Sequence, residues 1–144
     1  MRIDGEWLLC DDSVLRPVIR GEILASDGTW HPVEFLVDTG ADRTVFSAIV
    51  LASLRLHPVV TDARIGGVGG VVNSVVVETQ VRFTREESGK MVLRGQYAAV
   101  TELQSLDMSV LGRDITGLFA VVVDRPGNID CLLGQRHHYT IEPR

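Results

Sequence analysis

One aspartate stands where chemistry is most expected in this sequence. Residues 35–37 (Phe-Leu-Val) resemble the end of a buried strand, Asp38, Thr39 and Gly40 follow, and the apolar pattern resumes at residues 44–46. A carboxylate next to a buried run is costly unless something holds or uses its charge. The glycine two residues later allows a tight turn. The pattern predicts a carboxylate on a rigid loop between two strands, and a hairpin turn with a solvated aspartate is the alternative.

The elements around this loop are predicted from turn signals and apolar patterns. Residues 14–24 and 30–37 read as two strands, joined by a turn at Asp27-Gly28. This hairpin delivers Asp38 to its loop. After the loop, Ser47 is predicted to cap a short helix that runs to about residue 56.

Residues 65–72 (Ile-Gly-Gly-Val-Gly-Gly-Val-Val) are too rich in glycine for a helix. They also fit no nucleotide-binding loop, because no Gly-Lys-Ser/Thr triplet occurs and position 72, where a dinucleotide fingerprint needs glycine, is valine. We expect the tip of a hairpin. Residues 71–83 alternate as a long strand with one apolar face, and residues 91–100 read as its partner.

The C-terminal third begins with an apolar pair and a glycine. Gly112 permits a close backbone approach, and Asp114 is expected to cap a short helix. An ordinary strand-to-helix junction is the alternative. Further strands are predicted at 119–123, 129–133 and 139–141, with a turn at 125–128.

Composition excludes several classes of protein. The chain has 144 residues, which suits a single domain spanning 1–144, and 45% of them are apolar. A net charge of −5 argues against a nucleic-acid partner, and no apolar run is long enough to span a membrane. No signal-peptide pattern opens the chain, so Cys10 and Cys131 are expected to be reduced thiols in a cytoplasmic protein, with a disulfide between them as the alternative.

Three ordered motifs carry a resemblance to a known family. The stretch Leu-Val-Asp-Thr-Gly-Ala-Asp at 36–42, the Gly-rich segment at 65–72 and Val-Leu-Gly-Arg-Asp at 110–114 resemble the retropepsin-like aspartic proteases, the retroviral type and its bacterial relatives. The resemblance covers roughly residues 17–123. It implies a mainly β fold, a closed β-barrel of the acid-protease type, with one or two short helices and a Gly-rich flap hairpin.

The resemblance also implies roles for individual residues. Asp38 would be catalytic, the Thr39 hydroxyls would bond across a dimer axis, and Gly40 would bring its backbone to the carboxylate or the substrate. Gly112 and Arg113 would support the site, with Arg113 pairing with Asp42. The substrate-binding positions would be Ala41, Asp42, Gly66, Gly67, Val68, Gly69 and Gly70.

Only one Asp-Thr-Gly occurs, yet peptide hydrolysis needs a general base and a general acid. The resemblance implies a homodimer in which the two Asp38 carboxylates share a proton, as in aspartic proteases generally. The pair would activate a water on a polypeptide substrate, with no cofactor and no metal. The expected function is an aspartic endopeptidase. A non-cleaving dimerisation or peptide-binding module of the same fold and an unrelated β-barrel binding protein are the alternatives.

Other candidate residues are weaker. His137 and His138 are adjacent in a predicted strand and would face opposite ways, which disfavours a metal pair. Ser47 lacks the Gly-x-Ser-x-Gly setting of a hydrolase nucleophile. Asp11 and Asp12 are expected to form a solvated turn.

Overall fold

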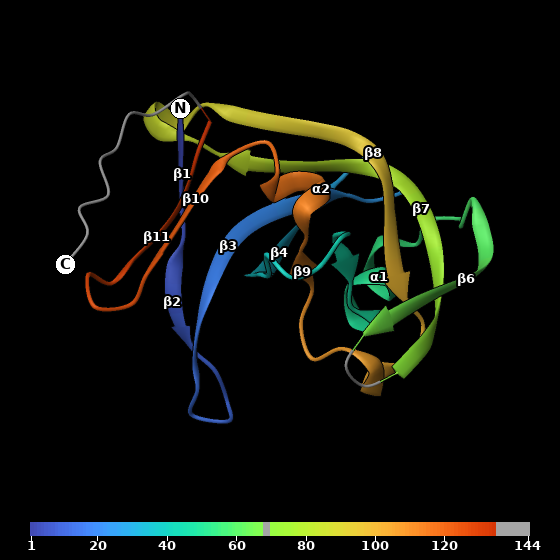
Figure 1. The fold of residues 1–144 in the computed structure, drawn as a ribbon. Helices are drawn as coiled ribbons and strands as arrows, with labels where there is room; N and C mark the ends of the chain where they lie inside the picture. Colours follow the sequence, from blue (N-terminus) through green and yellow to red (C-terminus); the bar gives the residue numbers. More distant parts are fainter. Residues whose placement is uncertain (68–69, 135–144) are drawn as a thin grey trace.

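The computed structural model describes residues 1–67 and 70–134. Most of these residues lie in strands (Figure 1). The strands are β1 (Arg2–Asp4), β2 (Glu6–Leu9), β3 (Leu15–Leu24), β4 (Trp30–Val37), β5 (Val45–Phe46), β6 (Val60–Gly67), β7 (Gly70–Thr84), β8 (Lys90–Val100), β9 (Val110–Leu111), β10 (Ala120–Asp124) and β11 (Ile129–Leu133). The helices are α1 (Ala48–Leu54) and α2 (Arg113–Thr116), with short 3-10 turns at Glu86–Ser88 and Leu103–Ser105.

The larger sheet is curved back on itself. Its strand order is β2-β3-β4-β9-β5-β8-β7-β6, and a second pairing of β3 with β7 closes a ring. The β3–β7 contact is short, at Glu22–Arg82 and Ile23–Val81. The mainly β class with two short helices is the predicted one.

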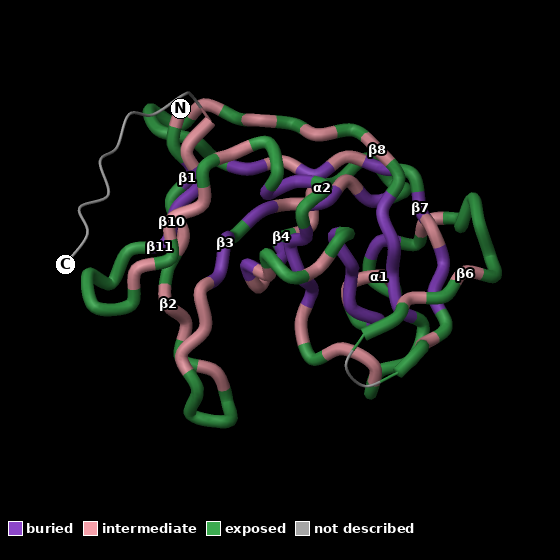
Figure 2. The backbone as a smooth tube through the Cα atoms, viewed as in Figure 1, coloured by how far each residue is buried: buried purple, intermediate pink, exposed green. Residues whose placement is uncertain are grey.

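The core lies inside this ring. Side chains that the period-two pattern of residues 71–83 placed on one face are all buried, from Val75 to Phe83. Three aromatic rings, those of Phe35, Phe46 and Phe83, are fully buried in contact with one another or with further core residues. Figure 2 shows that burial concentrates on the ring strands, whereas the hairpin tips are exposed.

Helix α1 follows the expected start but ends early. The Ser47 hydroxyl accepts a hydrogen bond from the Val50 backbone N–H at 3.4 Å, as an N-cap does. Arg55 adopts a left-handed conformation with φ of 53°, so the helix stops at Leu54 before the predicted end near residue 56.

A second, three-stranded sheet joins the two ends of the chain in the order β1-β11-β10. Its hydrogen bonding is antiparallel throughout, with Ile3 opposite Leu132 and Val121 opposite Leu132 on the other side. The strands at 119–123 and 129–133 were predicted. The predicted strand at 139–141 and the pair His137-His138 lie outside the described residues.

Candidate active site

Asp38 lies directly beyond β4, on a loop that β9 supports. Val37 pairs with Leu111 in parallel register, and the Asp38 backbone N–H donates to the Leu111 carbonyl at 3.2 Å. The Gly40 backbone N–H donates to the Asp38 carboxylate at 3.0 Å. Asp38 is half-buried, whereas Thr39 and Gly40 are exposed. The loop therefore holds one carboxylate at a fixed point and presents its next two residues to the surface.

Arg113, the first residue of α2, connects the helix to the loop through both its backbone and its side chain. Its backbone N–H donates to the Ala41 carbonyl at 2.8 Å, and its guanidinium donates to the Thr39 carbonyl at 2.8 Å. The same guanidinium bonds the Asp42 carboxylate, which is the ion pair that the sequence predicted. These charge-assisted bonds fix the loop on both sides of Gly40.

A second brace, which the sequence interpretation missed, joins Asp114 to Thr44. The Asp114 carboxylate accepts hydrogen bonds from the Thr44 backbone N–H at 2.9 Å and from its hydroxyl at 2.7 Å. Thr44 in turn accepts a bond from the Gly112 backbone N–H at 3.1 Å, and its side chain is fully buried. This chain of bonds fixes the end of the Asp38 loop to the start of α2.

The expected capping role of Asp114 is wrong in position. Gly112 occupies the N-cap, and Asp114 lies within the first turn, where it bonds the adjacent Ile115 N–H at 2.9 Å. Its main partners are on Thr44, across the fold. An aspartate near the start of a helix looks the same in the sequence whether it caps the helix or bonds a distant residue. The sequence alone therefore did not distinguish an N-cap from the bonds to Thr44.

Gly112 is required by the close approach of the two segments. A Cβ atom at this position would lie 2.2 Å from the carbonyl carbon of Arg43. Backbone cannot move aside as a flexible side chain does, so only glycine fits without displacing the loop.

The Gly-rich hairpin, formed by β6 and β7, packs on a small apolar cluster next to the Asp38 loop. Gly67 pairs with Gly70 near its tip, while Val68 and Gly69 lie outside the described residues. A Cβ at Gly66 or Gly67 would meet nothing within 4 Å. Ile65 and Val72, from the two arms, pack on the same cluster as Ala41. The fold thus brings the hairpin and the Asp38 loop together.

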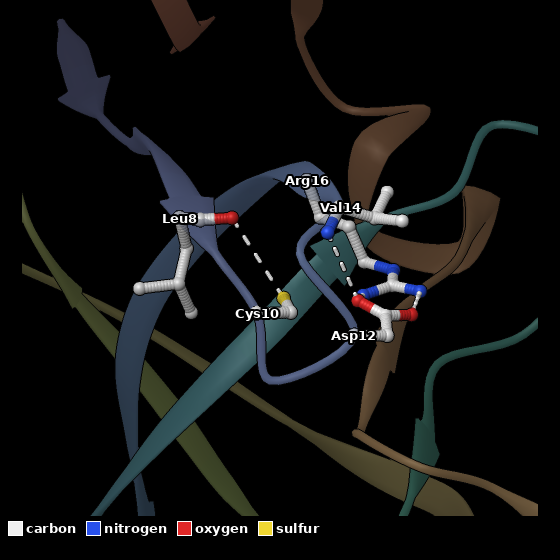
Figure 3. Close-up of polar contacts among 5 residues, drawn as sticks. All are labelled: Leu8, Cys10, Asp12, Val14 and Arg16. Atoms are coloured by element: carbon white, nitrogen blue, oxygen red, sulfur yellow. Dashed lines mark hydrogen bonds and ion pairs between the residues drawn. The ribbon is translucent and has the colours of Figure 1, made fainter.

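A groove of about 990 Å³ opens beside the loop. Leu36, two residues before Asp38, and its β9 partner Val110 line this groove, although Asp38 itself is not among its lining residues. One wall includes Ile49 of α1, and the other is the β2–β3 hairpin. Figure 3 shows the hairpin tip, where Asp12 bonds Arg16 in bidentate fashion at 2.6 and 2.9 Å. The Arg16 guanidinium lowers the pKa of Asp12. Asp11 and Asp12 are exposed in a turn, as predicted.

Within residues 1–67 and 70–134 there is no group of three or more His, Cys, Asp or Glu side chains placed to hold a metal ion. Cys10 and Cys131 are both free. No helix in the described part of the chain is long and apolar enough to cross a membrane.

Comparison with known proteins matches this geometry. The family model described as aspartyl protease matches residues 20–115. A protease from EIAV, solved with the inhibitor HBY-793, is 26% identical, with 71% of this chain and 86% of that chain covered and a TM-score of 0.52. A retropepsin-like aspartic protease from Rickettsia conorii is 15% identical, with 92% and 89% covered and a TM-score of 0.55. No curated protein matches the sequence significantly.

The matched segment runs from β3 to α2 and contains the Asp38 loop, the Gly-rich hairpin and the Arg113 brace. The chain therefore belongs to the aspartyl protease family, and its fold is that of the retropepsins.

Proposed function

We propose that this protein is a homodimeric aspartic endopeptidase and that residues 1–144 form its single domain. The observation that carries the proposal is the single Asp38 carboxylate, held on a loop that α2 braces from both sides of Gly40. A carboxylate that served only structure would have its charge satisfied inside the fold. Asp38 instead stands half-buried beside two exposed loop residues.

Two copies supply what one copy lacks. One Asp38 would act as the general base on a water, and the protonated Asp38 of the second copy would polarise the scissile carbonyl and protonate the leaving amine. Thr39, exposed at the tip of the loop, would meet its counterpart across the dimer axis.

The substrate would be an extended polypeptide between the Gly-rich hairpin, acting as a flap, and the loop floor. Ala41 packs on the cluster that the hairpin arms share, and exposed Asp42 has carboxylate capacity left for substrate N–H groups. Main-chain recognition of this kind tolerates many side chains. Gly66, Gly67 and Gly70 would contribute backbone groups that bind the substrate main chain. A cytoplasmic location stays a prediction.

The test is cleavage of a mixed peptide library by wild type and Asp38→Asn from acidic to neutral pH, with mass measured by light scattering. We expect a dimer whose cleavage falls by about 10²–10⁴-fold or more in Asp38→Asn. A pepstatin-type mimic should bind wild type and not the variant, since it needs an assembled carboxylate pair. Cleavage that survives in Asp38→Asn contradicts the mechanism.

A non-cleaving module of the same fold is the second candidate. It predicts a stable dimer that binds extended peptides, cuts none at any pH, and binds them equally well after Asp38→Asn.

A further inference from the structure

The groove beside the Asp38 loop continues away from that loop along the outer face of β4. Leu36, Glu34 and Pro32 alternate along this strand and all line the groove. The Cα atom of Leu36 lies within about 7 Å of that of Asp38, because two residues of chain span no more. From Leu36 to Pro32 the strand rises by about 13 Å. The groove therefore starts next to the candidate catalytic loop and has the length of about four extended residues.

Exposed apolar side chains lie on both walls of the groove. Leu9, at the end of β2, is 65% exposed, and Ile49, in the first turn of α1, is 71% exposed. Figure 1 shows β4 between the β2–β3 hairpin and α1. Single exposed apolar residues are ordinary on a protein surface, but apolar side chains that gather around one groove indicate a binding site. The two walls thus favour an occupant with large apolar side chains.

β4 lacks a strand neighbour on one side where it lies under the groove. β9 pairs with Leu36 and Val37 only, so among the described residues 32–35 have a strand neighbour on the β3 side alone. The Leu36 backbone N–H donates to the Ser109 carbonyl at 2.9 Å. The backbone groups of Glu34 point to that same side, because their direction alternates along a strand. Such a stretch can pair with a short extended peptide.

The charges around the groove leave it acidic. Its two arginines, Arg16 and Arg20, each donate to a carboxylate at 2.6 Å, so their charges are already compensated. Asp11 and Asp107 also line the groove and are exposed, and neither pairs with a lysine or arginine among the described residues. The groove therefore complements a positively charged side chain better than a negatively charged one.

We propose that this groove is a second recognition site for the polypeptide substrate. It holds an extended segment that flanks the scissile bond, pairs with β4 at Glu34, and carries apolar side chains together with lysine or arginine. This rests on the proposed function, since a chain held over Asp38 that continues past the cleaved bond enters the groove. Main-chain binding under the Gly-rich hairpin tolerates many side chains, so the groove supplies the sequence preference.

The test uses peptides that share one cleavage sequence found in the mixed library. One peptide carries a Leu-Lys-Leu-Lys extension and the other a Gly-Ser-Gly-Ser extension, placed on either side of the cleavage sequence in turn. On one of the two sides, the Leu-Lys extension should lower KM by about tenfold relative to Gly-Ser, with kcat unchanged. Equal KM values for the two extensions on both sides overturn the groove site.

Two arginine variants locate the effect. Ile49→Arg puts a bulky cation on the α1 wall, so the advantage of the Leu-Lys peptide should disappear while the Gly-Ser peptide is cleaved as by wild type. Val92→Arg is the control, because Val92 is 44% exposed on β8 and does not line the groove, and it should keep the full advantage. An Ile49→Arg variant that keeps the advantage contradicts the groove site.

Asp107→Asn tests the charge separately. It should reduce the preference for lysine over glutamine in the extension and leave cleavage of the Gly-Ser peptide unchanged. A lysine preference that is the same in wild type and Asp107→Asn would contradict the proposed charge complementarity.

A binding measurement separates this site from the endopeptidase itself. The labelled Leu-Lys peptide should bind wild type, slow hydrogen exchange of the Glu34 amide, and bind Ile49→Arg more weakly. If these changes occur in a protein that cleaves no peptide, the groove stands as a peptide-binding site and the endopeptidase fails. If cleavage occurs and the Glu34 amide is unaffected, the endopeptidase stands and pairing with β4 is wrong.

Discussion

Asp114, next to the Asp38 loop, and Asp130, in the terminal sheet, differ in how their carboxylates are hydrogen-bonded. Asp114 accepts three hydrogen bonds, two from Thr44 and one from the Ile115 N–H. Asp130 is 3% exposed, yet neither of its carboxylate oxygens makes a hydrogen bond with the described residues. Burial raises the pKa of Asp130 to about 6, and the nearby Val18 backbone opposes this only in part.

The two aspartates show that the regions differ. Hydrogen bonds hold the Asp38 loop and α2 in one geometry, whereas the terminal sheet buries a carboxylate at a cost in free energy. Around Asp38, hydrogen bonds from Arg113 to Thr39 and from Thr44 to Asp114 connect the loop to α2, which suits a site where small displacements reduce the rate. In the terminal sheet, the buried Asp130 carboxylate has no hydrogen-bond partner among the described residues. Such violations concentrate where a protein has a functional reason to keep them.

The largest loss of stability is expected when a methyl group is added at Gly112, between the Asp38 loop and α2. Gly112→Ala places a Cβ against the Arg43 backbone, so the loop must shift, and we expect a loss of about 3 kcal/mol or more in unfolding free energy. Cleavage should fall with it. Gly67→Ala is the matched control, because its Cβ meets nothing within 4 Å, and it should melt like wild type. Equal melting temperatures for the two variants would show that the loop is not tightly braced.

Asp130 should make the terminal sheet sensitive to pH. Its pKa is raised from 3.8 to about 6 in the folded chain, so the folded state retains a proton that the unfolded state has lost. Stability from this group is therefore greatest below about pH 4 and falls by about 2–3 kcal/mol as the pH rises to about 6.

Asp130→Asn removes that titration. The variant should be more stable than wild type at pH 7, and the difference should vanish near pH 4, as measured by denaturant unfolding at each pH. A difference that is constant with pH would mean that Asp130 is solvated or paired in solution.

Asp114→Ala tests the satisfied aspartate directly. It leaves the buried Thr44 N–H and hydroxyl without their acceptor, which should cost about 1–3 kcal/mol. Asp114→Asn keeps an acceptor oxygen and should recover most of that loss. If Asp114→Ala is as stable as wild type, the hydrogen bonds of Asp114 do not stabilise the fold, and the contrast with the unbonded Asp130 fails.

The smallest effect on stability is expected at the surface ion pair. Arg113 is 51% and Asp42 84% exposed in their side chains, so Arg113→Ala should change unfolding free energy by less than about 1 kcal/mol. Cleavage should suffer more, because the bond to the Thr39 carbonyl that positions the loop is lost. Arg113→Lys cannot make both contacts and should lie between wild type and alanine. Parallel losses of stability and rate would assign Arg113 to folding alone.

Much of the fold follows from local patterns. The alternation that buried Val75, Val77 and Val81 on one face predicted the long β7 strand, since a strand exposes its two faces in turn. Asp27-Gly28 marked the turn between β3 and β4. The loop aspartate was recognisable because a charged residue interrupts an apolar run, and the Asp42–Arg113 pair came from the family resemblance.

Other features depend on segments far apart in the chain. The Asp114–Thr44 brace spans 70 positions, and no local pattern distinguishes it from an ordinary helix cap. The burial of Asp130 has the same origin, because a polar residue within a short strand is normally expected at the surface.

By itself the sequence determined the strands, the turns and the carboxylate on its loop, because periodicity and backbone preference act over a few residues. Tertiary structure decided which strands became neighbours. It placed β11 between β1 and β10, brought Gly112 against Arg43, and buried Asp130. These outcomes depend on the packing of the whole chain, because each is set by the apolar surface that is still exposed after the local elements have formed.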